Sequence, residues 1–161
     1  MESIIITLEQ LKKLSMEIAV LACGCFWGPE IKFSKLEGII KTEVGYCGGN
    51  SKNVTYEEVC SGDTNHAEVV KLEFDPKKIS YEKILEYFFE IHNPTTLNSQ
   101  GPDIGTQYRS EIFYVNENQM KIAEKIIEEN NIKYSGKVVT KLSKLKNYCR
   151  AEDYHQKYLE K

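Results

Sequence analysis

The order of strand and helix patterns along the chain constrains its fold more than any other feature. Residues 18–22 are apolar on both faces, which is typical of a central strand. Helical spacing follows at Ile31, Lys35 and Leu36 and stops at Gly38. Later patterns predict strands at residues 39–46, 67–74 and 111–115, and a helix at residues 80–92 capped by Ser80. The resulting order is the split β-α-β-β-α-β arrangement of ferredoxin-like sheets.

The remaining C-terminal residues add elements to this arrangement. Met120, Ala123 and Ile126 have the spacing of one helix face. A strand at residues 138–142 and a last helix from Ala151 follow. The sequence therefore predicts an α+β fold in which the ferredoxin-like unit carries an additional helix and strand.

The chain length indicates a single domain. A chain of 161 residues buries about 70% of the surface that it exposes when unfolded, so its core needs no disulfide or structural metal. No repeat, low-complexity segment or linker divides it. We expect a lead segment at residues 1–16 and one domain at residues 17–161.

Charge and cysteine content exclude several classes of protein. With 21 Lys and Arg against 24 Asp and Glu, the formal net charge is −3, which offers no basic surface for nucleic acid. No apolar run approaches the ~20 residues that span a membrane, and the N-terminal segment lacks the pattern of a signal peptide. Five cysteines are too few for a disulfide scaffold and odd in number. We expect a cytoplasmic protein whose thiols stay reduced.

Cys25 is a candidate nucleophile because it lies where the first strand turns into the first helix. The unpaired N–H groups and the dipole at a helix N-terminus stabilise a thiolate. A pKa lowered from ~8.5 to about 7 would raise the ionised fraction at pH 7 from about 3% to about half. A small buried residue at a tight turn would fit the same position.

Glu68 is the most informative carboxylate. In a strand over residues 67–74, it shares a face with Val70, Leu72 and Phe74, so it extends an apolar row that points into the core. A pKa raised by about 2.7, or ~3.7 kcal/mol, would keep it half protonated near pH 7. A neutral carboxylic acid can donate a proton to a substrate oxygen. The alternative is a strand-end glutamate turned out to solvent.

Aromatic residues lie close to Cys25 in the sequence. Phe26 and Trp27 follow it directly, and two large rings can form an apolar cup for a methyl group. Aromatic residues at such spacing also form ordinary core.

The polar segment at residues 93–109 is longer than most connections, and such loops often carry function. It contains Asp103 and Tyr108. The hydroxyl groups of Tyr108 and of Tyr56, which lies earlier in the chain, are both candidate hydrogen-bond donors to a substrate oxygen.

A metal site has little support in the sequence. Cys23 and Cys25 form a Cys-x-Cys pair, but there is no second pair and no Cys-x-x-Cys, and the three histidines show no ligand spacing. We expect no metal. Two other classes remain open: a metal-handling module, which would bind Cu(I) or Zn in a manner lost in Cys23→Ser, and a cysteine hydrolase, which would show burst release from a thioester.

Five motifs in the same order resemble peptide methionine sulfoxide reductase A. They are GCFWG at residues 24–28, GYCGG at 45–49, TYEEVCSGDTNHAEV at 55–69, GTQYRS at 105–110 and AEDYHQ at 151–156. The resemblance extends from about residue 17 to the C-terminus. The family's ferredoxin-like α/β core with extra elements agrees with the predicted element order.

The resemblance implies an activity and a role for each candidate residue. The family reduces the S epimer of methionine sulfoxide, free or in proteins, without a metal or other cofactor. The implied roles are Cys25 as nucleophile, Phe26 and Trp27 as the pocket for the S-methyl group, Glu68 as the acid toward the sulfoxide oxygen, Tyr56 and Tyr108 as hydrogen-bond donors, and Asp103 as an organising residue. Oxygen transfer would leave a sulfenic acid on Cys25, which a second thiol must reduce.

That second thiol is where the sequence departs from the family. Many members carry recycling cysteines in a Gly-rich tail after AEDYHQ, whereas this sequence ends at Lys161, so we expect that cysteine to be absent. Cys149, just before AEDYHQ, is the best internal candidate for a resolving thiol. Cys23 would close a strained ring with Cys25, and Cys47 and Cys60 lie in loop motifs. Otherwise glutathione, glutaredoxin or thioredoxin would reduce Cys25 directly. Some such members carry selenocysteine where this sequence has Cys25.

Overall fold

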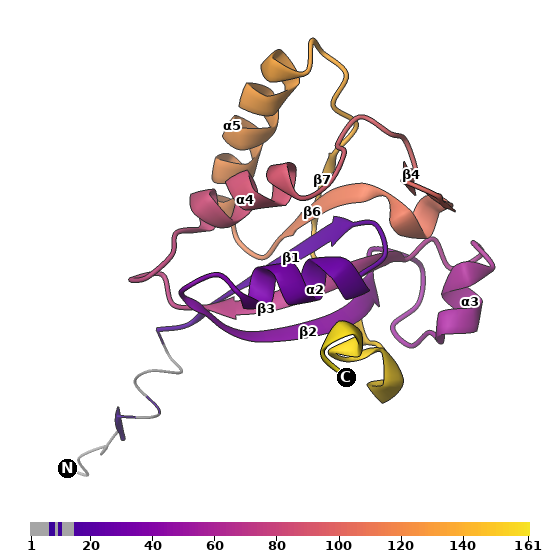
Figure 1. The fold of residues 1–161 in the computed structure, drawn as a ribbon, viewed down its shortest axis with the longest axis horizontal. Helices are drawn as coiled ribbons and strands as arrows, with labels where there is room; N and C mark the ends of the chain where they lie inside the picture. The colour runs from indigo at the N-terminus through magenta and orange to yellow at the C-terminus, as the bar shows by residue number, and fades with distance from the viewer. Residues whose placement is uncertain (1–6, 9, 11–14) are drawn as a thin grey trace.

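A six-stranded sheet organises the protein in the computed structural model, which describes residues 7, 8, 10 and 15–161 (Figure 1). The strand order is β7-β6-β1-β3-β2-β8. All neighbours are antiparallel except β6 and β7, which are parallel. The strands are β1 (Glu17–Cys23), β2 (Ile39–Cys47), β3 (Ala67–Phe74), β6 (Ser110–Tyr114), β7 (Lys141–Lys144) and β8 (Cys149–Arg150). The predicted lead segment at 1–16 lies mostly outside the described residues.

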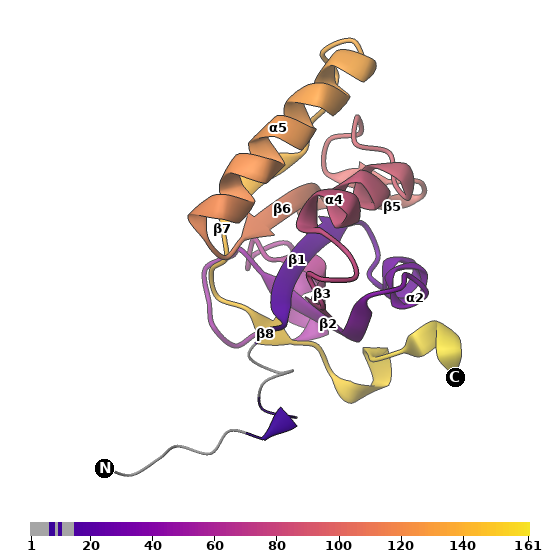
Figure 2. The same ribbon diagram turned by 90° about the vertical axis from the view of Figure 1, so that its left-hand side faces the viewer.

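Three helices cover one face of this sheet (Figure 2). They are α2 (Trp27–Ser34), α4 (Tyr81–Glu90) and α5 (Glu117–Lys133). Side chains of β1, β2 and β3 pack with Phe33 of α2, Phe88 of α4 and Ile126 of α5 in one apolar cluster. The opposite face has a smaller cluster around Val20 and Phe113. The main core therefore lies between the sheet and the helices.

Helix starts follow local side-chain chemistry. The Ser80 hydroxyl accepts a hydrogen bond from the N–H of Lys83, as predicted, and Asn116 does the same for α5. A short helix that the sequence analysis missed, α3 (Tyr56–Cys60), begins with a capping box between Thr55 and Glu58. The described residues form a mixed α/β fold, and none of their helices is both long and apolar enough to cross a membrane.

The predicted helix from Ala151 is wrong. Two 3-10 helices, η2 (Asp153–His155) and η3 (Tyr158–Glu160), occupy this segment. The Gln156 side chain bonds both the N–H and the carbonyl of Val44, at 2.9 Å each. Lys157 has a left-handed backbone, with φ of 51°. These tertiary contacts hold the chain along β2 and prevent a continuous helix.

Two other segments differ from prediction. The strand expected at residues 138–142 begins at Lys141, because the N–H of Val139 donates to the Pro94 carbonyl instead of a strand partner. The loop at residues 93–109 contains a hairpin of β4 (Ser99–Gln100) and β5 (Asp103–Ile104), then the 3-10 helix η1 (Thr106–Tyr108). The Gln100 side chain of this hairpin lies against Gly24, the residue that follows β1.

Candidate active site

Cys25 lies in the tight turn that joins β1 to α2. The turn depends on Gly24, whose φ is 96° and where a Cβ atom would lie 2.8 Å from the Gln100 side chain. Phe26 is the N-cap residue of α2 and is 1% exposed, and Trp27 is the first helical residue. Cys25 itself is half-buried. The turn thus presents the thiol at the edge of the core, as the sequence analysis expected.

Glu68 points into the protein beside this turn. Its side chain is on β3 and only 2% of the residue is exposed, so the solvent-facing alternative is wrong. Its carboxylate accepts a hydrogen bond from the N–H of Phe26 at 3.3 Å. Burial raises the pKa of Glu68 to about 8, against the opposing effect of that N–H, and the charge of Asp103 raises it further. Glu68 is therefore mostly protonated at neutral pH.

The expected low pKa of Cys25 is wrong. Burial raises the pKa of this thiol to about 11; the Trp27 N–H lowers it, and the charges of Glu68 and Asp103 raise it. Burial and the two acidic side chains raise the pKa of Cys25 more than the N–H groups at the helix N-terminus lower it. A thiolate gains little from one N–H hydrogen bond when it loses its hydration. At neutral pH the site holds a thiol next to a carboxylic acid.

Two tyrosines and Asp103 complete the surroundings of Glu68. Burial and then the charge of Glu68 raise the pKa of Tyr108 to about 12. The hydrogen bond of the Tyr56 hydroxyl to Cys60 raises the pKa of Tyr56, with burial second. Both hydroxyls are therefore protonated and can donate hydrogen bonds. The structure brings all five predicted polar residues together, although they come from four separate segments.

An aromatic wall flanks the turn. The Phe26 and Trp27 rings lie 5.3 Å and 5.7 Å from the His155 ring. The Trp27 indole N–H donates to Nδ1 of His155 at 3.2 Å, and Trp27 stacks on Tyr158 with ring centroids 3.9 Å apart. Burial lowers the pKa of His155, which keeps the imidazole neutral with Nδ1 free to accept. Neither His155 nor Tyr158 was among the site residues predicted from the sequence.

Glu152 is a second residue that sequence reasoning missed. One carboxylate oxygen accepts from the Tyr56 N–H at 2.9 Å and the other from the Tyr46 hydroxyl at 3.0 Å. It thereby fixes the first turn of α3 and with it the Tyr56 ring. The only sign of its role in the sequence was its place in the AEDYHQ motif. Its two partners lie about a hundred residues away in the chain, so the sequence could not identify them.

The family model described as peptide methionine sulfoxide reductase matches residues 17–161. The chain belongs to the peptide methionine sulfoxide reductase family. A peptide methionine sulfoxide reductase MsrA of Pelagibacter ubique (strain HTCC1062) is 77% identical over 146 residues, covering 91% of this chain and 99% of that protein. The resemblance inferred from the five motifs is confirmed.

Solved structures of the family agree with the fold. Mxr1 from Saccharomyces cerevisiae in reduced form has a TM-score of 0.88 at 42% identity, covering 91% of this chain and 86% of that one. Mxr1 in complex with Trx2 has a TM-score of 0.65 at 28% identity, covering 90% and 86%. The likeness therefore extends over nearly the whole described fold.

Cys149, the predicted resolving thiol of this reductase-family chain, lies across the sheet from Cys25. It pairs with Tyr46 of β2, which pairs in turn with Glu68 of β3. Two strands thus lie between β8 and β1, and neighbouring strands are about 4.8 Å apart. A disulfide requires the two Cα atoms to lie within ~7 Å of each other. From this strand spacing we expect direct bonding to Cys25 to need a rearrangement of the segments around β8.

The other cysteines have different environments. Cys23 and Cys47 are buried, and burial raises both thiol pKa values, that of Cys23 to about 12. Cys60 is exposed and bonds the Tyr56 hydroxyl. In the part of the chain that the structure describes, no three His, Cys, Asp or Glu side chains gather in a form that would hold a metal ion.

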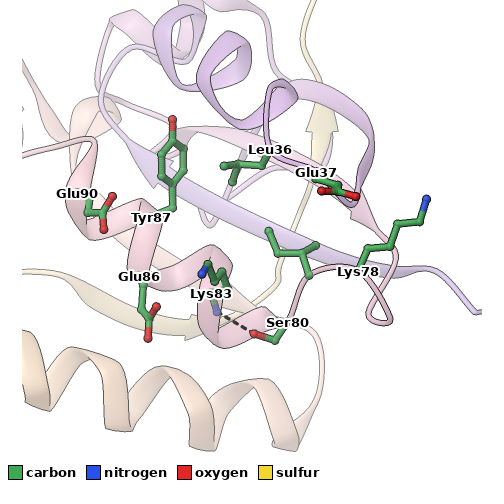
Figure 3. A pocket seen from close by; sticks show the side chains of 9 residues that line it. Leu36, Glu37, Lys78, Ser80, Lys83, Glu86, Tyr87 and Glu90 are labelled. Atoms are coloured by element: carbon green, nitrogen blue, oxygen red, sulfur yellow. Dashed lines mark hydrogen bonds between the residues drawn. The ribbon is translucent and has the colours of Figure 1, made fainter.

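A hollow of about 440 Å³ lies away from these residues, between the end of α2 and α4 (Figure 3). Leu36, Tyr87 and Lys83 are among its lining side chains. None of the residues predicted for the reductase site lines it, so it is not part of that site.

Proposed function

We propose that this protein reduces methionine-S-sulfoxide, free or in proteins, with Cys25 as the nucleophile. The observation that carries the proposal is the burial of the Glu68 carboxyl beside Cys25, where it accepts the Phe26 N–H and where burial raises its pKa to about 8. A sulfoxide sulfur becomes electrophilic when its oxygen is protonated or strongly hydrogen-bonded. A thiol and a neutral acid side by side supply both needs of this reaction.

In the first step, Glu68 donates its proton to the sulfoxide oxygen and Tyr56 and Tyr108 donate hydrogen bonds to it. The Glu68 carboxylate then takes the Cys25 proton as sulfur attacks sulfur. The raised pKa of Cys25 suits this order, because the thiol keeps its proton until a base forms beside it. The sulfoxide S–O bond breaks as the hydroxyl passes to the Cys25 sulfur, and the transient S–S bond breaks as methionine leaves. The methionine sulfur is thereby reduced by two electrons and the Cys25 sulfur is oxidised to a sulfenic acid.

The aromatic wall suits the methyl group of the substrate. Phe26 and Trp27 lie on the helix side of the turn, directly after the nucleophile. An apolar wall on one side and hydrogen-bond donors on the other distinguish the methyl from the oxygen on the sulfur. This arrangement accounts for selectivity between the two sulfoxide epimers.

In the second step, a thiol attacks the sulfenic acid, water leaves and a disulfide forms; a further thiol then releases Cys25. We propose a thioredoxin as that reductant, because the related Mxr1 forms a complex with Trx2. Glutaredoxin and glutathione supply the same chemistry. A cytoplasmic location, where thiols are kept reduced, suits this cycle. The pairing order β6-β1-β3-β2 supports the ferredoxin-like description of the catalytic domain at residues 17–161.

Reduction of the two separate epimers tests the proposed function. With dithiothreitol as reductant, we expect the wild-type protein to convert the S epimer of a methionine sulfoxide peptide to methionine and to leave the R epimer unchanged. Chromatography of the products measures both. Equal rates on the two epimers, or no product from either, would contradict the proposal.

The number of thiols consumed in one turnover identifies the resolving thiol. Because β8 is separated from β1, we expect one turnover without reductant to leave a single sulfenic acid that dimedone traps on Cys25. Thiol titration and mass spectrometry give the count. Loss of two thiols in wild type but only one in Cys149→Ser would instead identify Cys149 as an internal partner.

A further inference from the structure

Glu30 is a buried carboxylate that the proposed reaction does not use. It lies on α2, one turn after Trp27, and is 1% exposed. Its Oε1 accepts the backbone N–H of Lys157 at 2.7 Å, and its Oε2 accepts the Thr42 hydroxyl at 2.9 Å. The Lys157 ammonium lies 3.8 Å from Oε2. A buried carboxyl group with this many partners joins α2, β2 and the C-terminal segment.

Lys157 is the joint between the two C-terminal 3-10 helices. Its left-handed backbone, with φ of 51°, separates η2 from η3 and turns its N–H toward α2. The Lys157 ammonium also donates to the Thr42 carbonyl at 3.1 Å. Glu30 therefore binds the segment at the point where the chain changes direction.

The segment on either side of this joint holds Trp27. His155 of η2 accepts the indole N–H, and Tyr158 of η3 stacks on the ring with 12° between the planes. Tyr158 and Leu159 are 43% and 52% exposed, so η3 buries little apolar surface of its own. Its attachment depends on the stacking and on the polar contacts at Lys157. Figure 2 shows this segment in yellow below α2.

We propose that Glu30 is a positioning residue of the substrate pocket, which clamps residues 153–160 against α2 so that Trp27 is fixed between His155 and Tyr158. This proposal rests on the proposed function only in making Trp27 a wall of the methyl pocket. Glu30 and Trp27 are one helical turn apart, so α2 carries both the clamp and the ring that it fixes. Release of the clamp frees the ring without altering Cys25 or Glu68.

Trp27 is the only tryptophan, so its fluorescence reports the clamp directly. In Glu30→Ala, we expect acrylamide to quench the fluorescence at least twofold more strongly. The KM for an S-sulfoxide peptide should rise roughly tenfold, with a smaller change in kcat. Glu37→Ala removes an exposed carboxylate just after the same helix and should match wild type in both measurements.

Glu30→Asp covers the case in which Glu30→Ala does not fold. Its shorter side chain keeps the charge but cannot reach Thr42 and Lys157 together, so we expect the same two changes at smaller size. Unchanged quenching in a folded Glu30 variant would overturn the proposal, as would a lower kcat at unchanged KM. The quenching result is independent of turnover, so it distinguishes failure of the clamp from failure of the proposed function.

Discussion

Replacing Cys25 with serine is expected to abolish reduction of methionine-S-sulfoxide, lowering the first-turnover rate by more than about 10³-fold. A serine hydroxyl is a far weaker nucleophile toward sulfur and cannot form a sulfenic acid. The side chain is half-buried at a turn set by Gly24, so the substitution fits the space and the fold should persist. Rapid-quench measurement of methionine formed in one turnover checks this result.

Cys149→Ser is the matched control for this prediction. Cys149 lies on β8 and could act only after the sulfenic acid has formed on Cys25. The first-turnover rate of Cys149→Ser should therefore equal that of wild type. Full activity of Cys25→Ser would contradict the proposed mechanism. A thioester burst that depends on Cys25 would favour a hydrolase instead.

Replacing Glu68 with glutamine is expected to slow the first turnover about 10²–10⁴-fold at pH 7 while substrate binding changes little. Glutamine keeps the shape of the side chain, but its amide cannot give up a proton to the sulfoxide oxygen. The defect should be smallest at low pH, where solvent protons assist. First-turnover rates of wild type and variant between pH 5 and 9.5 measure the effect.

The pH dependence of the wild type follows from the pKa of Glu68, about 8. Below this pH the carboxyl is protonated and its donor function is present, so the rate should be level. Above it the proton is lost, and the rate should fall about tenfold per pH unit. The Gln variant lacks this titration. A wild-type rate that rises between pH 6 and 9, or an unchanged rate in Glu68→Gln at neutral pH, would count against Glu68 as the acid.

Local patterns predicted most of the core because each depends on neighbouring residues. The alternation over residues 67–74 placed Glu68 inward, and the Ser80 cap started α4 where expected. The helix predicted from Ala151 was wrong because that segment depends on distant residues and not on its neighbours. Its conformation depends on Val44, which Gln156 bonds, and no local pattern reveals a partner 112 residues away.

The amino-acid sequence by itself determined the element order, the family and the candidates Cys25 and Glu68, since periodicity and motifs are properties of contiguous residues. Only the tertiary structure decided their protonation. Burial and the charge of Asp103 raise both pKa values and outweigh two backbone N–H groups that lower them, so Glu68 is an acid and Cys25 a thiol at neutral pH. It also brought His155, Tyr158 and Glu30 to Trp27, because electrostatics and packing depend on distance in space.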